Sequence, residues 1–441
     1  MAPTLSIADR ARRRIMRRIV PYLFLLYTVA YLDRVNLGYA ALQMTHDLHF
    51  GPEVYGFGAG IFFIGYFLLE IPGSILVERW SARRWIARIM ITWGMMAVCT
   101  GFVRTAHQFY WVRFLLGLAE AGFFPGMVVY LSHWFRAQDR ARALAAFIAA
   151  QPISNILGSP LSGWLLGIHW HGWAGWRWLF VLEGVPAVVL GIVTLFYLTD
   201  WPHQAKWLPE DERAWLAAEL ERERQSKPAH LAKAKIWRAL CHRDVLQVTA
   251  AYFLVVAGGY VVNFWMPTLI KGISGFSNLL VTILCALPYC VGLAVGLLMG
   301  WTSDRTGERR FHTATGMLLI GVGLGAVVLF SNSTALALAG FCVAAAGIYG
   351  YQPAMWQLAT RMLTGTAAAA SIGLINSIGN LGGFAGPYVL GYLTNKTHSF
   401  AAGVLTMAGA AVLAAALVVQ LPAVRQAMPS ATSSSSSGED S

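Results

Sequence analysis

The chain has 441 residues, of which 57% are hydrophobic and only 12% are charged, and its mean hydropathy is +0.55. Soluble domains usually carry about 25% charged residues, so this composition excludes an ordinary water-soluble protein. The formal net charge of +12 could suit a nucleic-acid partner, but the arginines are spread over many short connections between apolar segments, which argues against one.

Apolar segments of about 20 residues, the length that crosses a bilayer as a helix, recur along the whole chain. Their hydrophobicity is continuous rather than alternating, and the hydrocarbon core tolerates only helices and closed barrels. We therefore predict an all-α, multi-pass membrane protein with twelve transmembrane helices. The predicted spans are residues 19–44, 55–77, 85–105, 108–134, 141–168, 177–199, 245–270, 278–302, 312–330, 335–361, 366–393 and 400–421.

Polar segments divide these spans into two groups of six. The long connection after the sixth span begins a run with helical spacing at Pro209, so we predict a surface helix there. The Ser-rich end of the chain is expected to be disordered. The predicted parts are a basic cytoplasmic tail (1–18), an N-terminal half (19–199), a cytoplasmic linker (200–244), a C-terminal half (245–421) and a disordered cytoplasmic tail (422–441).

Basic residues are distributed asymmetrically between alternate connections. One set of connections carries only Arg104, Arg177, Lys271 and Lys396. An excess of Lys and Arg marks the cytoplasmic side of a membrane, so both termini are predicted to be cytoplasmic, with the chain in the inner membrane of a bacterium. The basic residues of the other set and of the tails are Arg10, Arg12, Arg13, Arg14, Arg17, Arg18, Arg79, Arg83, Arg84, Arg88, Arg136, Arg140, Arg142, Arg305, Arg309, Arg310, Arg361 and Arg425.

Three landmarks of the first half recur in the second half at nearly the same offset. This repetition predicts two halves that share one fold and one orientation in the membrane. The paired residues are Glu78 and Asp304, Pro125 and Pro353, and Pro160 and Pro387, which lie 226, 228 and 227 residues apart.

Five short motifs carry a resemblance to a known family: ERWSARR at 78–84, DRTGERR at 304–310, YLDRVNL at 31–37, RFLLGLAE at 113–120 and WRWLFVLEGVP at 176–186. The doubled turn motif resembles the signature of the major facilitator superfamily, although its first copy has Glu and Ser where Asp and Gly are usual. The other three motifs resemble the anion:cation symporter family, in particular its tartrate and sugar-acid proton symporters. The resemblance covers nearly all of residues 15–421 and implies the major facilitator fold.

Ionisable side chains occur deep inside the predicted spans of the first half, where burying a charge is costly. Asp33 and Arg34 lie about fourteen residues into the first span, and Glu120 lies at similar depth in the fourth. Arg113 precedes Glu120 by two helical turns, so the two share a helix face about 10 Å apart. Four long stretches that cover most of the spans of the second half contain no Asp, Glu, Lys or Arg, so we assign the charge chemistry to the first half. The uncharged stretches are 245–270, 272–303, 312–360 and 362–395.

A carboxylate in a low-dielectric site binds a proton more readily than one in water, and a nearby arginine opposes this. We hypothesise that Asp33 and Glu120 carry protons while a substrate carboxylate competes for the arginines. The resemblance implies similar roles, with Arg34 as the clamp for the substrate carboxylate and Arg113 as the residue that tunes Glu120. Structural ion pairs and sodium coupling are the alternatives.

Polar and aromatic side chains at matching depth complete a predicted substrate site. Gln151 and Asn376 each lie about ten residues from the cytoplasmic end of their span, where buried amides suit hydroxyl or carboxylate recognition, and the resemblance implies substrate contacts there. Asn155 and Asn380 could be either substrate contacts or interhelical bonds. The predicted substrate-binding residues are Arg34, Arg113, Gln151, Asn376, Tyr31, Tyr66 and Trp356.

Other charged residues are assigned structural roles. Glu70 and Glu183 are interpreted as acids that pair helices, and Glu70 is the better candidate for a gate. The resemblance implies a cytoplasmic gate that pairs helix ends in the outward-facing state. Its predicted residues are Glu78, Arg79, Asp304 and Arg305.

These expectations favour proton-coupled symport of a small organic anion, such as a tartrate-like or sugar-acid carboxylate, by alternating access in a monomer. No cofactor and no metal is expected, and neither a phosphate-binding loop nor a nucleophile–base pair suggests an enzyme. One rival is proton-antiport efflux of a drug or metabolite, although the fifth span matches the efflux motif only in part. Another is a membrane sensor that binds the same ligand without transporting it.

Overall fold

The computed structural model describes residues 6–79, 81–225, 240–362 and 365–421, and this part of the chain is all-helical. The helices are α1 Ile7–Asp47, α2 Pro52–Arg79, α3 Ala82–Thr100, α4 Ala106–Glu120, α5 Phe123–Trp134, α6 Ala137–Ile148, α7 Ala150–Leu166, η1 Trp170–Gly172, α8 Gly175–Tyr197, η2 Pro202–Gln204, α9 Glu210–Gln225, α11 Arg243–Ser274, α12 Asn278–Thr306, α13 Arg310–Leu329, α14 Thr334–Met362, α15 Gly365–Asn380, α16 Gly382–Thr397 and α17 Phe400–Val419.

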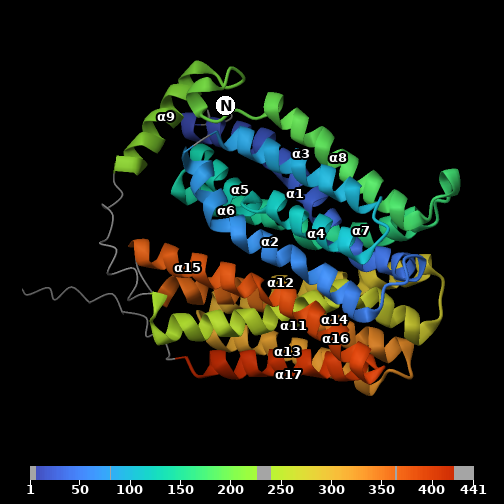
Figure 1. Cartoon of the computed structure of the whole chain (residues 1–441). Helices are drawn as coiled ribbons and strands as arrows, with labels where there is room; N and C mark the ends of the chain where they lie inside the picture. The colour runs from blue at the N-terminus through green and yellow to red at the C-terminus, as the bar shows by residue number, and fades with distance from the viewer. Residues whose placement is uncertain (1–5, 80, 226–239, 363–364, 422–441) are drawn as a thin grey trace, which may run out of the picture.

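The helices form two bundles that lie side by side, α1–α8 in one and α11–α17 in the other (Figure 1). The starts of four helices in the first bundle, α2, α3, α4 and α6, recur 226 to 228 residues later as the starts of α12, α13, α14 and α15. The two bundles are therefore built from the same helix pattern, as expected from the recurring landmarks.

Ten segments within the described residues have the length and apolarity needed to cross a membrane. Helix α3 carries three arginines near its start and is not among them. Helices α15 and α16 are 16 residues each, shorter than the roughly 20 residues that a span requires, so they could cross only in series. The count of twelve spans and the cytoplasmic placement of the termini stay predictions.

Three predicted spans are each interrupted and consist of two helices. The break with the clearest cause separates α4 from α5, where Gly122 has φ +83°, a left-handed conformation that favours glycine. The other breaks lie at Ala149, between α6 and α7, and at Leu381, between α15 and α16. Because of the first break, Glu120 is the last residue of α4 rather than a residue in mid-helix.

Most of the N-terminal basic tail is helical, because α1 begins at Ile7 and includes it. Its arginines pair with the predicted surface helix, which is α9. Arg10 lies 2.8 Å from Asp211, and Arg14 lies 3.0 Å from the almost fully buried carboxylate of Glu212. These ion pairs attach α9 to the first bundle. The predicted disordered tail 422–441 lies outside the described residues.

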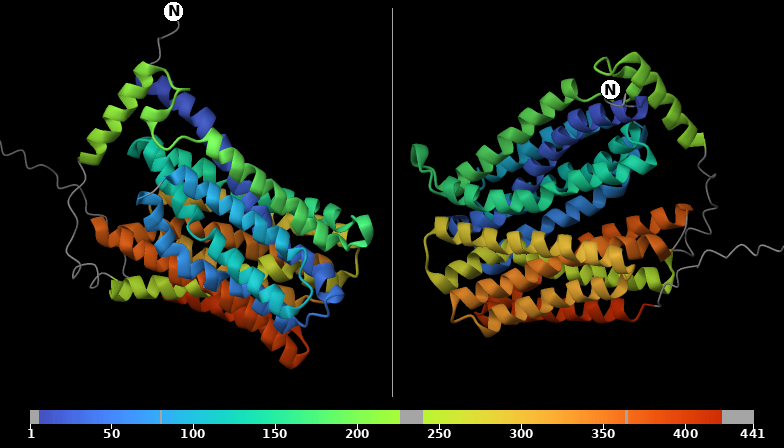
Figure 2. Two further views of the ribbon diagram at one scale, coloured as in Figure 1. Left: turned by 45° about the horizontal axis from the view of Figure 1, so that its top comes forward. Right: turned by 180° about the vertical axis from the view of Figure 1, so that it is seen from behind.

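We call the end of the molecule where α1 begins and α9 lies the linker end, and the opposite end the far end. The helices of the two bundles lie close together at the far end and farther apart at the linker end (Figures 1 and 2). At the far end, the Tyr55 hydroxyl donates to the backbone oxygen of Phe264 at 2.9 Å, and Asn395 donates to Glu53 at 3.0 Å. Hydrogen bonds therefore join the two halves at the far end.

Candidate functional site

Arg34 and Glu120 form an ion pair inside the first bundle. Arg34 lies on α1, and its Nη2 donates to Oε1 of Glu120 at the end of α4. Glu120 is 2% exposed, so this pair lies in a low-dielectric environment where an ion pair is strong. Two residues assigned from sequence to different tasks, proton coupling and substrate binding, are thus direct partners.

Asp33, the neighbour of Arg34 on α1, has a different set of partners. It accepts hydrogen bonds from the indole of Trp93 on α3 and, at 3.0 Å, from the amide of Asn36. Arg113 is buried, and its positive charge acts on Asp33. The direct partner of Glu120 in this structure is Arg34, and the tuning of Glu120 by Arg113 stays a prediction.

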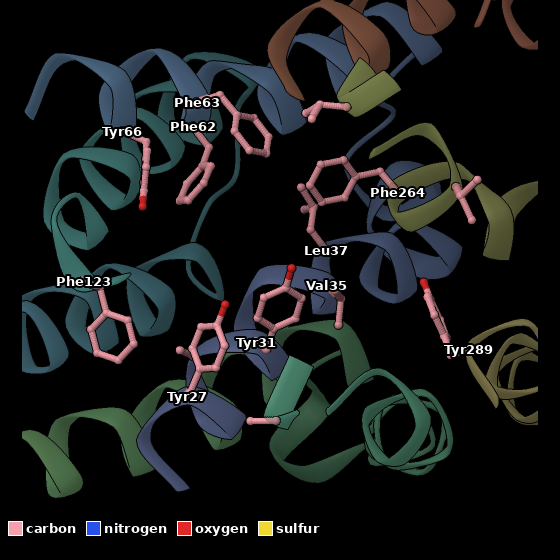
Figure 3. Close-up of a cluster of buried hydrophobic side chains, with 14 of the residues drawn as sticks. Tyr27, Tyr31, Val35, Leu37, Phe62, Phe63, Tyr66, Phe123, Phe264 and Tyr289 are labelled. Atoms are coloured by element: carbon pink, nitrogen blue, oxygen red, sulfur yellow. The ribbon is translucent and has the colours of Figure 1, made fainter. Parts of the chain in front are cut away.

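Aromatic rings surround the Arg34 guanidinium. Its Cζ lies 5.5 Å from the ring centre of Tyr31, 5.6 Å from that of Tyr66 and 5.7 Å from that of Phe62. Figure 3 shows the hydroxyl groups of Tyr31 and Tyr66 turned toward the same space between α1 and α2. Tyr31 and Tyr66 therefore lie beside Arg34, as the sequence led us to expect, and cation–π attraction orients the guanidinium.

A small cavity lies between the two bundles. Its lining residues from the first half are Arg34, Phe62, Phe63 and Tyr66, and those from the second half are Tyr260 and Asn380. Asn380, for which the sequence left two roles open, thus lies at this cavity.

Sequence reasoning missed Tyr260 as a site residue, although one signal was available. Tyr260 stands 227 residues after Asp33, which is the offset of the internal repeat. The electrostatic interaction between Tyr260 and Arg34 places this tyrosine opposite the charged residues of the first half. The repeat can therefore locate a neutral counterpart of a charged site residue.

The remaining predicted contacts lie apart from the cavity lining. Asn376 on α15 donates its amide to Glu70 on α2 at 2.5 Å. Trp356 packs against Tyr252, with ring centres 5.4 Å apart, and Gln151 lies half-buried at the start of α7. Asn376 thus joins the two halves in this structure, and substrate contact by Asn376, Gln151 and Trp356 stays a prediction.

Asn155, the other amide whose role was open, forms an interhelical bond. Its amide donates to the hydroxyl of Tyr349 on α14 at 2.7 Å. The bond joins α7 of the first half to α14 of the second. Asn155 is therefore a contact between the halves in this structure.

Glu183 extends the acidic network around Asp33. It is 6% exposed on α8, accepts a hydrogen bond from Ser162 at 3.4 Å, and interacts with the side chain of Asn36. Because Asn36 also donates to Asp33, one amide lies between two buried carboxyl groups. The sequence indicated only a helix-pairing acid, since it could not place α8 beside the middle of α1.

Of the predicted cytoplasmic gate, only the side chains from the second half lie within the described residues. Asp304 pairs with Arg309 at 2.8 Å and accepts from Gln357 at 3.2 Å, and Arg305 lies over the ring of Trp301. All of these partners belong to the second half. The side chains of Glu78 and Arg79 lie outside the described residues, so the gate stays a prediction.

No group of three or more His, Cys, Asp or Glu residues that could hold a metal ion occurs in the part of the chain that the structure describes. What this part does hold is a set of buried acids and arginines. The Nε atoms of Arg34 and Arg113 are buried and have no hydrogen-bond partner among the described residues. Because buried donors are almost always satisfied, these two are suited to an anionic ligand.

Comparison with known proteins agrees with this fold. The sequence profile of the Major Facilitator Superfamily matches residues 23–387. A putative tartrate transporter of Agrobacterium vitis is 47% identical over 421 residues, covering 94% of this chain and 95% of that protein. A quinolone resistance transporter of Acinetobacter baumannii is 38% identical over 404 residues, covering 89% and 90% of the two chains. The crystal structure of a bacterial homologue of the human lysosomal transporter Spinster superposes with a TM-score of 0.72 at 16% identity, covering 93% and 95%.

Proposed function

Because this chain belongs to the Major Facilitator Superfamily and is a multi-pass transporter of the bacterial inner membrane, we propose that it takes up a small hydroxylated organic anion together with protons. Alternating access would move the anion, as the two similar halves rock around a site between them. The joined far end and the separated linker end support this mechanism, since they correspond to one of its two extreme states.

The observation that carries the proposal is the ion pair between Arg34 and Glu120. A substrate carboxylate needs a buried cation as its partner. In this structure the Arg34 guanidinium is already paired with the Glu120 carboxylate. A proton on Glu120 removes that competitor and frees the guanidinium for the substrate. Proton and anion binding then favour each other, and such reciprocal coupling is what a symporter requires.

The balance of buried charge supports the same coupling. Asp33, Glu70, Glu120 and Glu183 are all buried in the first half or at its contact with the second. Two arginines, Arg34 and Arg113, balance them. Adding an anion to a buried site that already has more acids than arginines is unfavourable, since uncompensated charge in low dielectric is costly. Protons that enter with the anion would offset its charge.

The proposed substrate class rests on the site and on the relatives. The tyrosine hydroxyls beside Arg34 suit a ligand with both a carboxylate and hydroxyl groups. One relative of 47% identity is described as a putative tartrate transporter, which is a carrier of such an acid. We therefore propose tartrate-like and sugar-acid carboxylates as the substrates of this chain.

The test is uptake of labelled tartrate, gluconate and glucarate into proteoliposomes, with and without an inward proton gradient. We expect at least one acid to accumulate only with the gradient. Asp33→Asn and Glu120→Gln should lose gradient-driven accumulation and keep exchange of internal for external substrate. Glu210→Gln, which alters an acid on α9 whose side chain is 91% exposed, is the control and should accumulate normally.

Other outcomes would contradict the proposal. Accumulation without a proton gradient, or normal accumulation by both variants, would make the buried acids structural. Dependence on an imposed sodium gradient would replace the proton as coupling ion. Loss of internal substrate driven by an inward proton gradient would favour efflux, the activity suggested for one relative by its name. Binding of an acid without any transport would favour a sensor.

A further inference from the structure

Glu70 is a buried acid to which the proposed coupling assigns no role as a proton carrier. It lies on α2, is 4% exposed, and faces α15 of the second half. The amide of Asn376 donates to its Oε1 at 2.5 Å. The other oxygen, Oε2, is buried and has no hydrogen-bond partner among the described residues. An unpaired buried acceptor is rare and suggests a missing donor.

The position of Glu70 relative to the cavity follows from helix geometry. Tyr66 lines the cavity on α2, and Glu70 is one helical turn from it toward the linker end. Asn380 lines the cavity on α15, and Asn376 is one turn from it in the same direction. The pair of Glu70 and Asn376 therefore lies one helical turn from the cavity on the side of the linker end. The positions on α2 and on α15 indicate this independently.

The two ends of the site carry opposite charges, with Arg34 at one end and Glu70 at the other. Arg34 lines the cavity beside Tyr66, and Glu70 lies one turn from Tyr66 on the same helix. A ligand carboxylate placed on Arg34 would direct the rest of the ligand toward Glu70. A hydroxyl at that point can donate to a carboxylate oxygen, whereas a second carboxylate cannot donate and is repelled.

We propose that Glu70 is a specificity-determining residue that accepts a hydrogen bond from a hydroxyl group of the substrate and disfavours a second carboxylate at the same place. Within the proposed substrate class, the carrier would thus prefer sugar acids with one carboxylate to dicarboxylates such as glucarate or tartrate, which it would bind more weakly. This inference rests on the proposed transport of organic anions. Asn376 acts as a positioning residue, because its bond to Oε1 fixes the direction of the free Oε2.

The alternative is that Glu70 only pairs two helices. A role in pairing predicts that its substitution alters stability and the rates for all substrates alike. A role in specificity predicts that the substitution alters the ratio between two substrates. The ratio is therefore the decisive measurement, since general damage to the protein changes both rates but not their quotient.

The experiment compares gluconate with glucarate, which share six carbons and differ only at one end, where gluconate has a hydroxyl and glucarate a carboxylate. Binding of each acid to the purified protein and its uptake into proteoliposomes are measured at pH 7 for the native chain and for Glu70→Gln. We expect the native chain to prefer gluconate. In Glu70→Gln the preference should shift toward glucarate by about tenfold, which corresponds to about 1.4 kcal/mol.

Two further variants keep the result interpretable. Glu70→Asp retains the charge that disfavours a second carboxylate, so it should shift the preference toward glucarate by less than Glu70→Gln does. Glu183→Gln removes a buried acid on the side of Asp33 and should leave the preference unchanged. An unchanged ratio in Glu70→Gln, or equal shifts in Glu70→Gln and Glu183→Gln, would overturn the inference while transport itself stands. Absence of binding and uptake of every acid by the native chain would instead refute the proposed function.

Discussion

The two halves of the molecule share one helix pattern but differ in chemistry. The first half buries Asp33, Arg113 and Glu120, and the residues 227 positions later are Tyr260, Gly340 and Gly347. The cavity-lining Tyr260 is neutral, and at residue 347 a Cβ would lie 2.4 Å from the backbone oxygen of Gly316. Where the first half carries charge, the second half thus carries a neutral wall or close helix packing. A duplicated fold can therefore specialise one copy while retaining its framework.

The backbone differs in the same place. In the first half the helix is broken after Glu120, and the equivalent helix of the second half, α14, continues without a break from Thr334 to Met362. A break inside a membrane leaves backbone groups available and places a side chain at a helix end, as is common where transporters bind ions. The comparison assigns the break to the half that carries the charges.

The largest effect should separate the charged half from the neutral one. Arg34, which pairs with Glu120 in this structure, is the proposed partner of the substrate carboxylate. Removal of one partner of a buried charge pair costs about 2–5 kcal/mol, so Arg34→Gln should lower the affinity for a transported acid by at least about 30-fold. Tyr260→Phe, the control in the second half, removes one hydroxyl, and its effect should stay within about tenfold. Competition for uptake of a labelled acid measures both. Equal losses would show that the halves share the charge chemistry.

A smaller effect should come from the helix break. Gly122→Ala forces a side chain into a left-handed conformation, so it should lower the stability by about 1–2 kcal/mol and lower the midpoint of thermal unfolding in detergent. Gly325→Ala, in the second half, is the control, because no atom lies within 4 Å of the added methyl group. That variant should unfold at the native temperature or slightly higher. A native-like Gly122→Ala would mean that the break is not needed.

The smallest effect should arise where the halves meet. Tyr349→Phe removes the bond from Asn155 and should shift the equilibrium between transport states by about 0.5–1.5 kcal/mol. Distances between spin labels at residues 221 and 306, exposed positions at the linker end of the two halves, report this shift. We expect altered proportions of the same distances. An unchanged distribution would show that this bond does not bias the equilibrium.

Much of the fold could be predicted because apolar length and arginine placement are local signals. The buried charges could be located from sequence for a similar reason. Burial of an ionisable side chain such as Asp33 or Glu120 in a membrane costs free energy, so its presence in a span indicates a function. The breaks at Ala149 and Leu381 were missed, because hydropathy does not change at a break. The early start of α1 was missed as well, because its arginines are stabilised by acids of α9 about 200 residues away.

The neutral part of the site was harder to predict. Phe63 and Tyr260 belong to the cavity lining. An aromatic side chain in a membrane span is not costly to bury, so its presence in the sequence does not indicate a functional site. The bond between Glu70 and Asn376 joins residues 306 positions apart in different halves, and no local pattern indicates it. Sequence therefore locates charged residues by what burial costs them, and only the arrangement of the helices shows which of them become partners.

The attachment of α9 to the first half bears on how the protein could be engineered. Because ion pairs hold α9 against α1, this surface helix should move with the first half when the two halves move relative to each other. A fluorescent label attached to an exposed residue of α9 would therefore report the position of the first half during the transport cycle.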